Sequence, residues 1–157
     1  MGDIHSTNNL PPGVTMPLPA DWVPVVSQVD DERVTHATAL LSPRARAEFM
    51  LRRLRAPERM QDSRLLATQS ARRALDGYDE VLVDENSWHS LELGDAKGLG
   101  FTVRCRSEGV RRAAYVVLLH EPQARDALLI VAHSEEEDLD GSRRDLEGLL
   151  STLRFAP

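Results

Sequence analysis

The side chains with the most versatile chemistry in this chain are its five histidines, His5, His36, His89, His120 and His133. A helical zinc motif places two histidines four positions apart, and no pair here has that spacing. His120 and His133 each follow an apolar run, Val116–Leu119 and Ala127–Ala132, and we expect these runs to form the arms of a hairpin. The two histidines would then face each other across it, with solvent at their edges. A metal ion would need a third ligand that the sequence does not specify, so we predict no metal site.

Three other stretches resemble reactive or ligand-binding motifs without matching them. The run "SEEEDLDG" (134–141) lacks the alternating carboxylates and late glutamate of a calcium loop, and we expect it to lead into a helix. "GDAKGLG" (94–100) lacks the Gly-Lys-Ser/Thr of a phosphate loop, so we interpret it as a turn between strands. In "ENSWHS" (85–90), neighbouring strand residues point to opposite faces, so contact between a serine and His89 is not implied. The sequence therefore predicts no catalytic residue and no cofactor.

Length, composition and net charge limit the classes of protein to which this chain can belong. The chain has 157 residues, 41% hydrophobic and 28% charged, which is typical of one soluble globular domain. No apolar run approaches the roughly 20 residues of a membrane-spanning helix, and the start lacks the pattern of a signal peptide, so we expect a cytoplasmic protein without membrane insertion. The net charge of −6 argues against general nucleic-acid binding. The single cysteine, Cys105, excludes an internal disulfide, and we interpret it as a small buried apolar residue.

The first half of the chain predicts strands followed by one helix. Residues 1–17 are polar and proline-bearing, so we expect a flexible tail ahead of a single domain over 18–157. "LPADWVPVV" (18–26) and "RVTHATALLSP" (33–43) read as strands, and Pro24 limits the first to an edge. Residues 45–55 fit a helix by propensity and a strand by alternation about equally. Residues 57–77 have helical spacing of apolar side chains and end at Asp76-Gly77.

The second half predicts an antiparallel sheet and a closing helix. Strand patterns occur in "DEVLVDE" (79–85), "SWHSLEL" (87–93), "LGFTVRCR" (99–106) and the hairpin of "AAYVVLL" (113–119) with "ALLIVAHS" (127–134). We place Gly94, Gly98 and Gly100 in the turn before the third strand. The hairpin arms are apolar throughout and should be central. Asp140 or Ser142 should cap the last helix, whose inward stripe is Leu146, Leu149, Leu150 and Leu153. The order predicts an α+β fold, a curved antiparallel β-sheet flanked by two main α-helices.

In four stretches the chain resembles the PsbP/LpqN-like family, which includes the DcrB-type proteins and the Mog-type Ran-binding factor. These stretches are "LPADWVPV" (18–25), "AEFMLRRLRAP" (47–57), "YVVLLHEPQARDALLIVAHS" (115–134) and "DLEGLLSTLRF" (145–155). Together they span about residues 17 to 156, and the chain looks like an actinobacterial member. The resemblance implies a PsbP-like α/β sandwich and favours a strand over residues 45–55. Many relatives carry a leader or lipid anchor, which we do not see here, so the cytosolic branches are the better guides.

What the resemblance implies for function is a non-catalytic accessory that binds a protein. We expect a chaperone or adaptor for a secreted or partner protein of a secretion system, with an apolar concave sheet face accepting a hydrophobic helix. The alternative is a small-molecule or lipid-binding protein with an apolar pocket on the sheet, and a homodimer through a sheet face is also open. The candidate contact residues are Trp88, Leu91, Phe101, Val103, Arg104 and Arg106. The opposing interpretation, that the apolar four are core, is stronger for Phe101 and Val103 than for Trp88.

Overall fold

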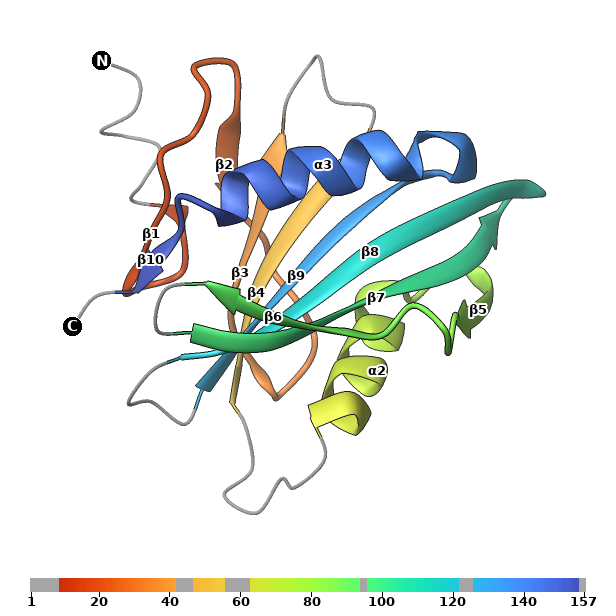
Figure 1. The fold of residues 1–157 in the computed structure, drawn as a ribbon, viewed down its shortest axis with the longest axis horizontal. Helices are drawn as coiled ribbons and strands as arrows, with labels where there is room; N and C mark the ends of the chain where they lie inside the picture. Colours follow the sequence, from red (N-terminus) through yellow and green to blue (C-terminus); the bar gives the residue numbers. More distant parts are fainter. Residues whose placement is uncertain (1–8, 42–46, 56–62, 94–95, 122–125, 156–157) are drawn as a thin grey trace.

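The fold is an antiparallel sheet with one helix on each face (Figure 1). The computed structural model describes residues 9–41, 47–55, 63–93, 96–121 and 126–155. The sheet contains β2 (Val23–Val26), β3 (Val34–Leu41), β4 (Glu48–Arg55), β5 (Asp79–Val83), β6 (His89–Leu93), β7 (Ala96–Ser107), β8 (Val110–His120) and β9 (Asp126–Glu135). Its order is β2-β3-β4-β9-β8-β7-β5, and β6 also pairs with β7. The described helices are α2 (Ser63–Ala74), α3 (Leu139–Leu150) and the short 3-10 turn η2 (Glu136–Asp138). The predicted α+β class is confirmed.

The central hairpin of β8 and β9 is buried on both faces. Along β8, Tyr115 and Val117 pack in the cluster that contains the leucines of α3. Val116 and Leu118 belong to the cluster that contains the buried side chains of α2. Since side chains alternate along a strand, two covered faces require an unbroken apolar run, and this is the pattern that placed the hairpin at the centre.

Residues 48–55 form the strand β4, as the family resemblance favoured. Phe49 and Leu51 are buried in the cluster beneath α3, and the backbone pairs with β3 on one side and β9 on the other. Pairing on both sides explains why the strand alternation prevails over the helix propensity of the same residues. Residues 45 and 46 lie outside the described residues.

The N-terminal segment differs from the flexible tail expected over residues 1–17. Residues 1–8 lie outside the described part, but Leu10, Val14 and Met16 are buried. The short strand β1 (Val14–Thr15) pairs with β10 (Arg154–Phe155), which follows α3. Burial of three apolar side chains and this pairing attach residues 9–17 to the domain.

Both helices have the predicted apolar faces, but the start of α3 differs from the prediction. In α2, Ala67 and Ala71 are fully buried, while the predicted start at residues 57–62 lies outside the described residues. The predicted cap of α3 by Asp140 or Ser142 is wrong. Asp138 is the N-cap residue, and Ser142 sits inside the helix, where its hydroxyl donates to the Asp138 carbonyl at 2.9 Å. The predicted inward leucines of α3 are all buried, namely Leu146, Leu149, Leu150 and Leu153.

The prediction that Gly98 and Gly100 belong to a turn is wrong. Both lie inside β7, where Gly98 is paired with Leu119 of β8 and with Leu91 of β6. A side chain at Gly98 would place its Cβ 2.1 Å from the carbonyl oxygen of Leu118. Glycine at this position allows the backbones of β7 and β8 to approach closely. Within a strand, glycine can mark such a close approach as well as a turn.

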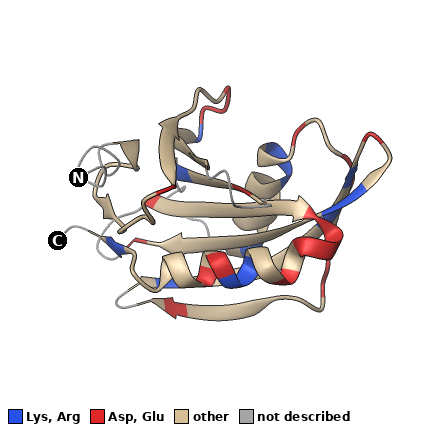
Figure 2. Ribbon diagram, turned by 90° about the horizontal axis from the view of Figure 1, so that it is seen from above, with Lys and Arg blue, Asp and Glu red and all other residues tan. Residues whose placement is uncertain are grey.

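Charged residues are unevenly distributed over the fold. Figure 2 shows acidic residues gathered where β9 passes through η2 into α3. As expected for the run "SEEEDLDG", the carboxylates lead into a helix, where they complement the positive end of its dipole. Of the helices that the structure describes, none combines the length and apolar character needed to cross a membrane.

Candidate functional site

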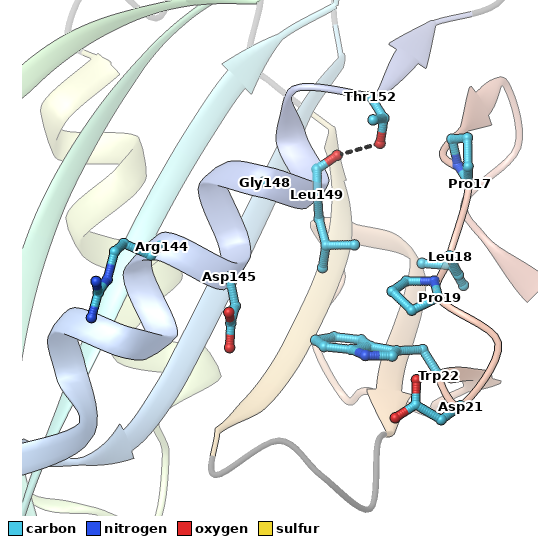
Figure 3. A pocket seen from close by; sticks show the side chains of 10 residues that line it. All are labelled: Pro17, Leu18, Pro19, Asp21, Trp22, Arg144, Asp145, Gly148, Leu149 and Thr152. Atoms are coloured by element: carbon cyan, nitrogen blue, oxygen red, sulfur yellow. Dashed lines mark hydrogen bonds between the residues drawn. The ribbon is translucent and has the colours of Figure 1, made fainter.

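A mainly apolar hollow among the described residues lies between α3 and the segment 17–22 that precedes β2 (Figure 3). We call it the α3 groove. Its volume is about 630 Å³. It is lined by Pro17, Leu18, Pro19, Asp21, Trp22, Arg144, Asp145, Gly148, Leu149 and Thr152.

The wall formed by residues 17–22 is fixed by local structure and by the core. The Trp22 amide donates to the Pro19 carbonyl at 2.9 Å, which closes a tight turn over residues 19–22. Pro17 and Pro19 also restrict the backbone of this segment, because the proline ring holds φ near one value. The Trp22 ring packs on Phe49, with ring centroids 4.7 Å apart and planes inclined by 46°. Leu18 is buried beside it in the same core cluster. An aromatic side chain therefore stands in a defined position at the groove, half-buried and backed by the core.

The opposite wall is one face of α3. Asp145, Gly148, Leu149 and Thr152 follow the spacing of three and four residues that places side chains on one side of a helix. In Figure 3, Asp145 and Leu149 point from the helix toward Trp22. A Cβ added at Gly148 would meet nothing within 4 Å. Because position 148 has no side chain, the helix side of the groove stays open.

The charges that face the groove are negative. Asp145 and Asp21 bring carboxylates from the two walls (Figure 3). Arg144 also lines the groove, but its Nε donates to the Asp140 carbonyl at 3.4 Å and its side chain points away from Trp22. The groove thus combines an aromatic and apolar surface with an acidic rim.

The structure brings Trp88, Phe101 and Val103 together in one cluster, and it places the other three predicted contact residues elsewhere. Phe101 and Val103 are fully buried on the face that α2 covers, so the interpretation of these two as core is the one that fits. Trp88 is half-buried and stacks on Phe101, with centroids 4.1 Å apart. The Arg64 guanidinium lies 5.1 Å from the centre of the Trp88 ring, which covers part of its outer face.

The other three candidates lie on the opposite face of the sheet or at its end. Leu91 packs against the core cluster beneath α3. Arg104 and Arg106 are exposed and pair with Glu136 and Glu80 respectively, the second at 3.0 Å. The open apolar sheet face expected from the sequence is likewise different in the structure, because a helix covers each face of the central strands.

The expectation that His120 and His133 face each other is wrong. His120 is opposite Ala127, whereas His133 is opposite Ala114, so they lie at opposite ends of the hairpin. Antiparallel arms place their carboxyl ends far apart, so residues that end both arms do not meet. His120 instead contacts the Ser63 hydroxyl at 2.9 Å, at the start of α2.

His133 is not solvent-facing but 3% exposed, within a polar cluster that sequence analysis missed. Its Nε2 lies 3.0 Å from the Glu48 carboxylate, and its Nδ1 lies 3.4 Å from both the Tyr78 hydroxyl and Arg112 Nη2. Burial lowers the pKa of His133, against the opposing effect of Glu48. We therefore assign a neutral ring that donates from Nε2 and accepts at Nδ1. Its partners come from β4, from β8 and from the segment between α2 and β5, so no local pattern could have indicated them.

His89 belongs to a second polar pair, at the edge of the sheet. Its Nε2 lies 2.8 Å from the hydroxyl of the fully buried Tyr115, and its Nδ1 lies 2.9 Å from the Ser87 carbonyl. The Ser87 hydroxyl donates to the Asp84 carbonyl and accepts from the Thr102 amide. The His89–Tyr115 pair attaches β6 to the central strand β8.

One group of described residues has the donor atoms for a cation. Carboxylate oxygens of Glu135, Glu137 and Asp138 lie within 4.8 Å of one another. Glu135 and Glu137 are exposed, and all three belong to the run before α3, which the helix dipole already accounts for. The cluster therefore gives no reason to assign a metal site.

Comparisons with known proteins find likeness in structure alone. No family model and no curated protein sequence matches the chain. The cyanobacterial PsbP protein CyanoP from Synechocystis has a TM-score of 0.64 at 9% identity, over 95% of this chain and 88% of that one. The Ran-binding protein Mog1p of Saccharomyces cerevisiae has a TM-score of 0.60 at 9% identity, over 91% and 90% of the two chains.

A third similar structure is LpqN of Mycobacterium tuberculosis, described as involved in cell envelope biogenesis. Its TM-score is 0.54 at 14% identity, over 94% of this chain and 87% of that one. At such low identities the likeness establishes a fold and leaves function open. The chain therefore has the fold shared by PsbP, LpqN and Mog1, as the resemblance in its sequence implied.

Proposed function

We propose that this protein is a non-catalytic binding protein of the cytoplasm that holds a segment of a partner protein in the α3 groove. The observation that carries this proposal is the groove itself, which sets Trp22, Leu18 and Leu149 around an open strip of helix at Gly148. Aromatic and apolar side chains in a defined position are what a peptide-binding groove needs.

The chemistry of the lining supports binding over catalysis. The polar side chains that line the groove are two aspartates, Arg144 and Thr152, and the described lining includes no histidine, cysteine or serine. The Thr152 hydroxyl donates to the Leu149 carbonyl at 2.8 Å, an ordinary bond at the end of a helix (Figure 3). A nucleophile needs an adjacent base, and this lining offers none in hydrogen-bond contact with Thr152.

The fold supports a chaperone or adaptor role by analogy. Mog1p, which is similar in fold at 9% identity, is a Ran-binding protein. A role beside a secretion machine follows from the sequence resemblance alone and forms the more specific part of the proposal.

A site-specific photo-crosslinker tests the proposed function. With p-benzoylphenylalanine at Thr152, on the groove, we expect one protein adduct of defined mass in cells of the native host. The matched control carries the same group at Leu82, which is 65% exposed on β5, and should not give this adduct. The second substitution Gly148→Leu should abolish the adduct at position 152. An adduct that appears equally from Leu82, or that survives Gly148→Leu, would contradict the proposal.

A small-molecule or lipid-binding protein remains the second candidate, for one reason. The groove volume of about 630 Å³ lies in the range of about 300–1,000 Å³ typical of small-ligand sites. Native mass spectrometry of the purified protein distinguishes the two. A bound lipid or metabolite that is absent from Gly148→Leu would favour this candidate over a partner protein.

A further inference from the structure

We propose that the segment bound in the α3 groove presents a lysine or arginine to Asp145 and Asp21, with the stem of that side chain lying on Trp22. This inference rests on the proposed function and specifies the chemistry of the partner. Its basis is the arrangement of charge, aromatic surface and open space within the groove.

The charge of the groove selects a cation. Within the described part of the chain, Asp145 has neither a hydrogen-bond nor an ion-pair partner, and it points toward Trp22 (Figure 3). The one basic side chain of the lining, Arg144, is directed to the Asp140 carbonyl instead. Asp21 adds a second carboxylate from the other wall. A basic side chain entering between these walls meets attraction from both sides.

The aromatic wall suits the same ligand. Trp22 is half-buried, so one part of its ring packs on Phe49 while another part faces the groove. Tryptophan is the best aromatic partner for a cation, and lysine and arginine lay their apolar stems along such surfaces. Pro19 and Leu18 extend the apolar surface for that stem.

The helix wall leaves room for the backbone of the segment. Glycine inside a helix costs about 1 kcal/mol relative to alanine. Gly148 nevertheless lines the groove on α3, and a Cβ added there would meet nothing within 4 Å apart from its own stretch of helix. Any side chain at this position would extend into the groove.

The net charge of −6 extends the preference beyond contact distance. An acidic protein attracts a basic segment over about 8 Å at physiological salt, and this attraction weakens as salt is added. Binding through the α3 groove should therefore be salt-sensitive.

Selection from a library of random 12-residue peptides tests the inference. The full chain serves as bait, and peptides that also bind Gly148→Leu are removed. The matched control is Gly141→Leu, at the other glycine of α3, which also has nothing within 4 Å but does not line the groove. We expect the recovered peptides to be enriched in lysine and arginine and to bind Gly141→Leu normally.

The affinity of one recovered peptide then measures the contribution of the Asp145 charge to binding. By fluorescence anisotropy, Asp145→Asn should weaken binding by about 2- to 5-fold, as expected for an exposed charge pair, and added salt should erase the difference. Trp22→Ala should weaken it further, and circular dichroism establishes that each variant is folded.

The outcomes separate this inference from the proposed function. Peptides that need an open Gly148 but carry no excess of basic residues, or that ignore Asp145→Asn, overturn the inference and leave the proposed function standing. Recovery of no peptide that depends on Gly148 overturns both. A dimer in sedimentation that Gly148→Leu dissociates would show that a second copy fills the groove, and would also overturn the inference.

Discussion

Alanine in place of Gly98 or Gly100 tests the close packing around β7. At Gly98 the new Cβ would lie 2.1 Å from the Leu118 carbonyl oxygen and 3.1 Å from its carbonyl carbon. These atoms belong to the backbone of the central strand β8, so they cannot move aside independently. At Gly100 the nearest atoms are side-chain atoms, the His89 ring at 2.6 Å and the Tyr115 hydroxyl at 2.8 Å.

The two substitutions should therefore lower the free energy of unfolding by different amounts. Overpacking a core costs about 1–3 kcal/mol and sometimes more, and we expect Gly98→Ala at or above the upper end because backbone must shift. For Gly100→Ala the His89 ring must turn away, which breaks its 2.8 Å bond to Tyr115. A buried hydroxyl without a partner costs about 1–3 kcal/mol, so we expect a loss in that range.

Urea denaturation followed by tryptophan fluorescence measures both losses. The control is Gly148→Ala, where nothing lies within 4 Å and helix propensity should raise the free energy of unfolding by about 0.5–1 kcal/mol. If Gly98→Ala unfolds within about 0.5 kcal/mol of the parent, the usual range for surface substitutions, the close approach of β7 to β8 is refuted.

Three further predictions concern buried or partly buried polar groups. Because burial lowers the pKa of His133 from 6.5, the unfolded state binds the extra proton, so stability should fall as pH drops below 6.5. In urea titrations His133→Gln should flatten this dependence more than His36→Gln, whose pKa is also lowered but whose ring is less buried; equal slopes would contradict it. Burial raises the pKa of the Cys105 thiol, so a disulfide reagent should label it only after unfolding, and rapid labelling of the native protein would be inconsistent. Arg53 and Glu121 pair at 2.7 Å with side chains 16% and 9% exposed. Because this pair is only partly buried, Arg53→Met should cost less than the about 3–5 kcal/mol lost when a fully buried pair is broken, and the added Glu121→Leu should restore part of the loss; an unchanged urea midpoint would refute this.

The sequence alone determined the centre of the sheet and the buried face of the last helix. Unbroken apolar runs placed β8 and β9 at the centre, and the spacing of leucines gave the buried face of α3. These features are local, because the period of a strand or helix decides which side chains share a face. For residues 45–55 the local signals were balanced, and the choice came from the resemblance, in agreement with pairing on both sides of β4.

The tertiary structure decided which residues lie beside one another. The sequence did not indicate that His133 would meet Tyr78 and Glu48, because that contact depends on the order and register of strands distant in the chain. The four apolar candidates are likewise divided, with Leu91 in the cluster beneath α3 and Trp88, Phe101 and Val103 in the cluster beneath α2, because correct strands do not by themselves specify which faces the helices cover.

The α3 groove is a feature that only the tertiary structure determines. Both of its parts were visible in the sequence, as "LPADW" before an edge strand and as a glycine within the last helix. Neither part indicates a site by itself, because the groove exists only where α3 crosses the sheet and passes the segment 17–22. Local periodicity indicated the buried faces of β8, β9 and α3, whereas long-range packing determined the burial of His133 and which exposed residues meet.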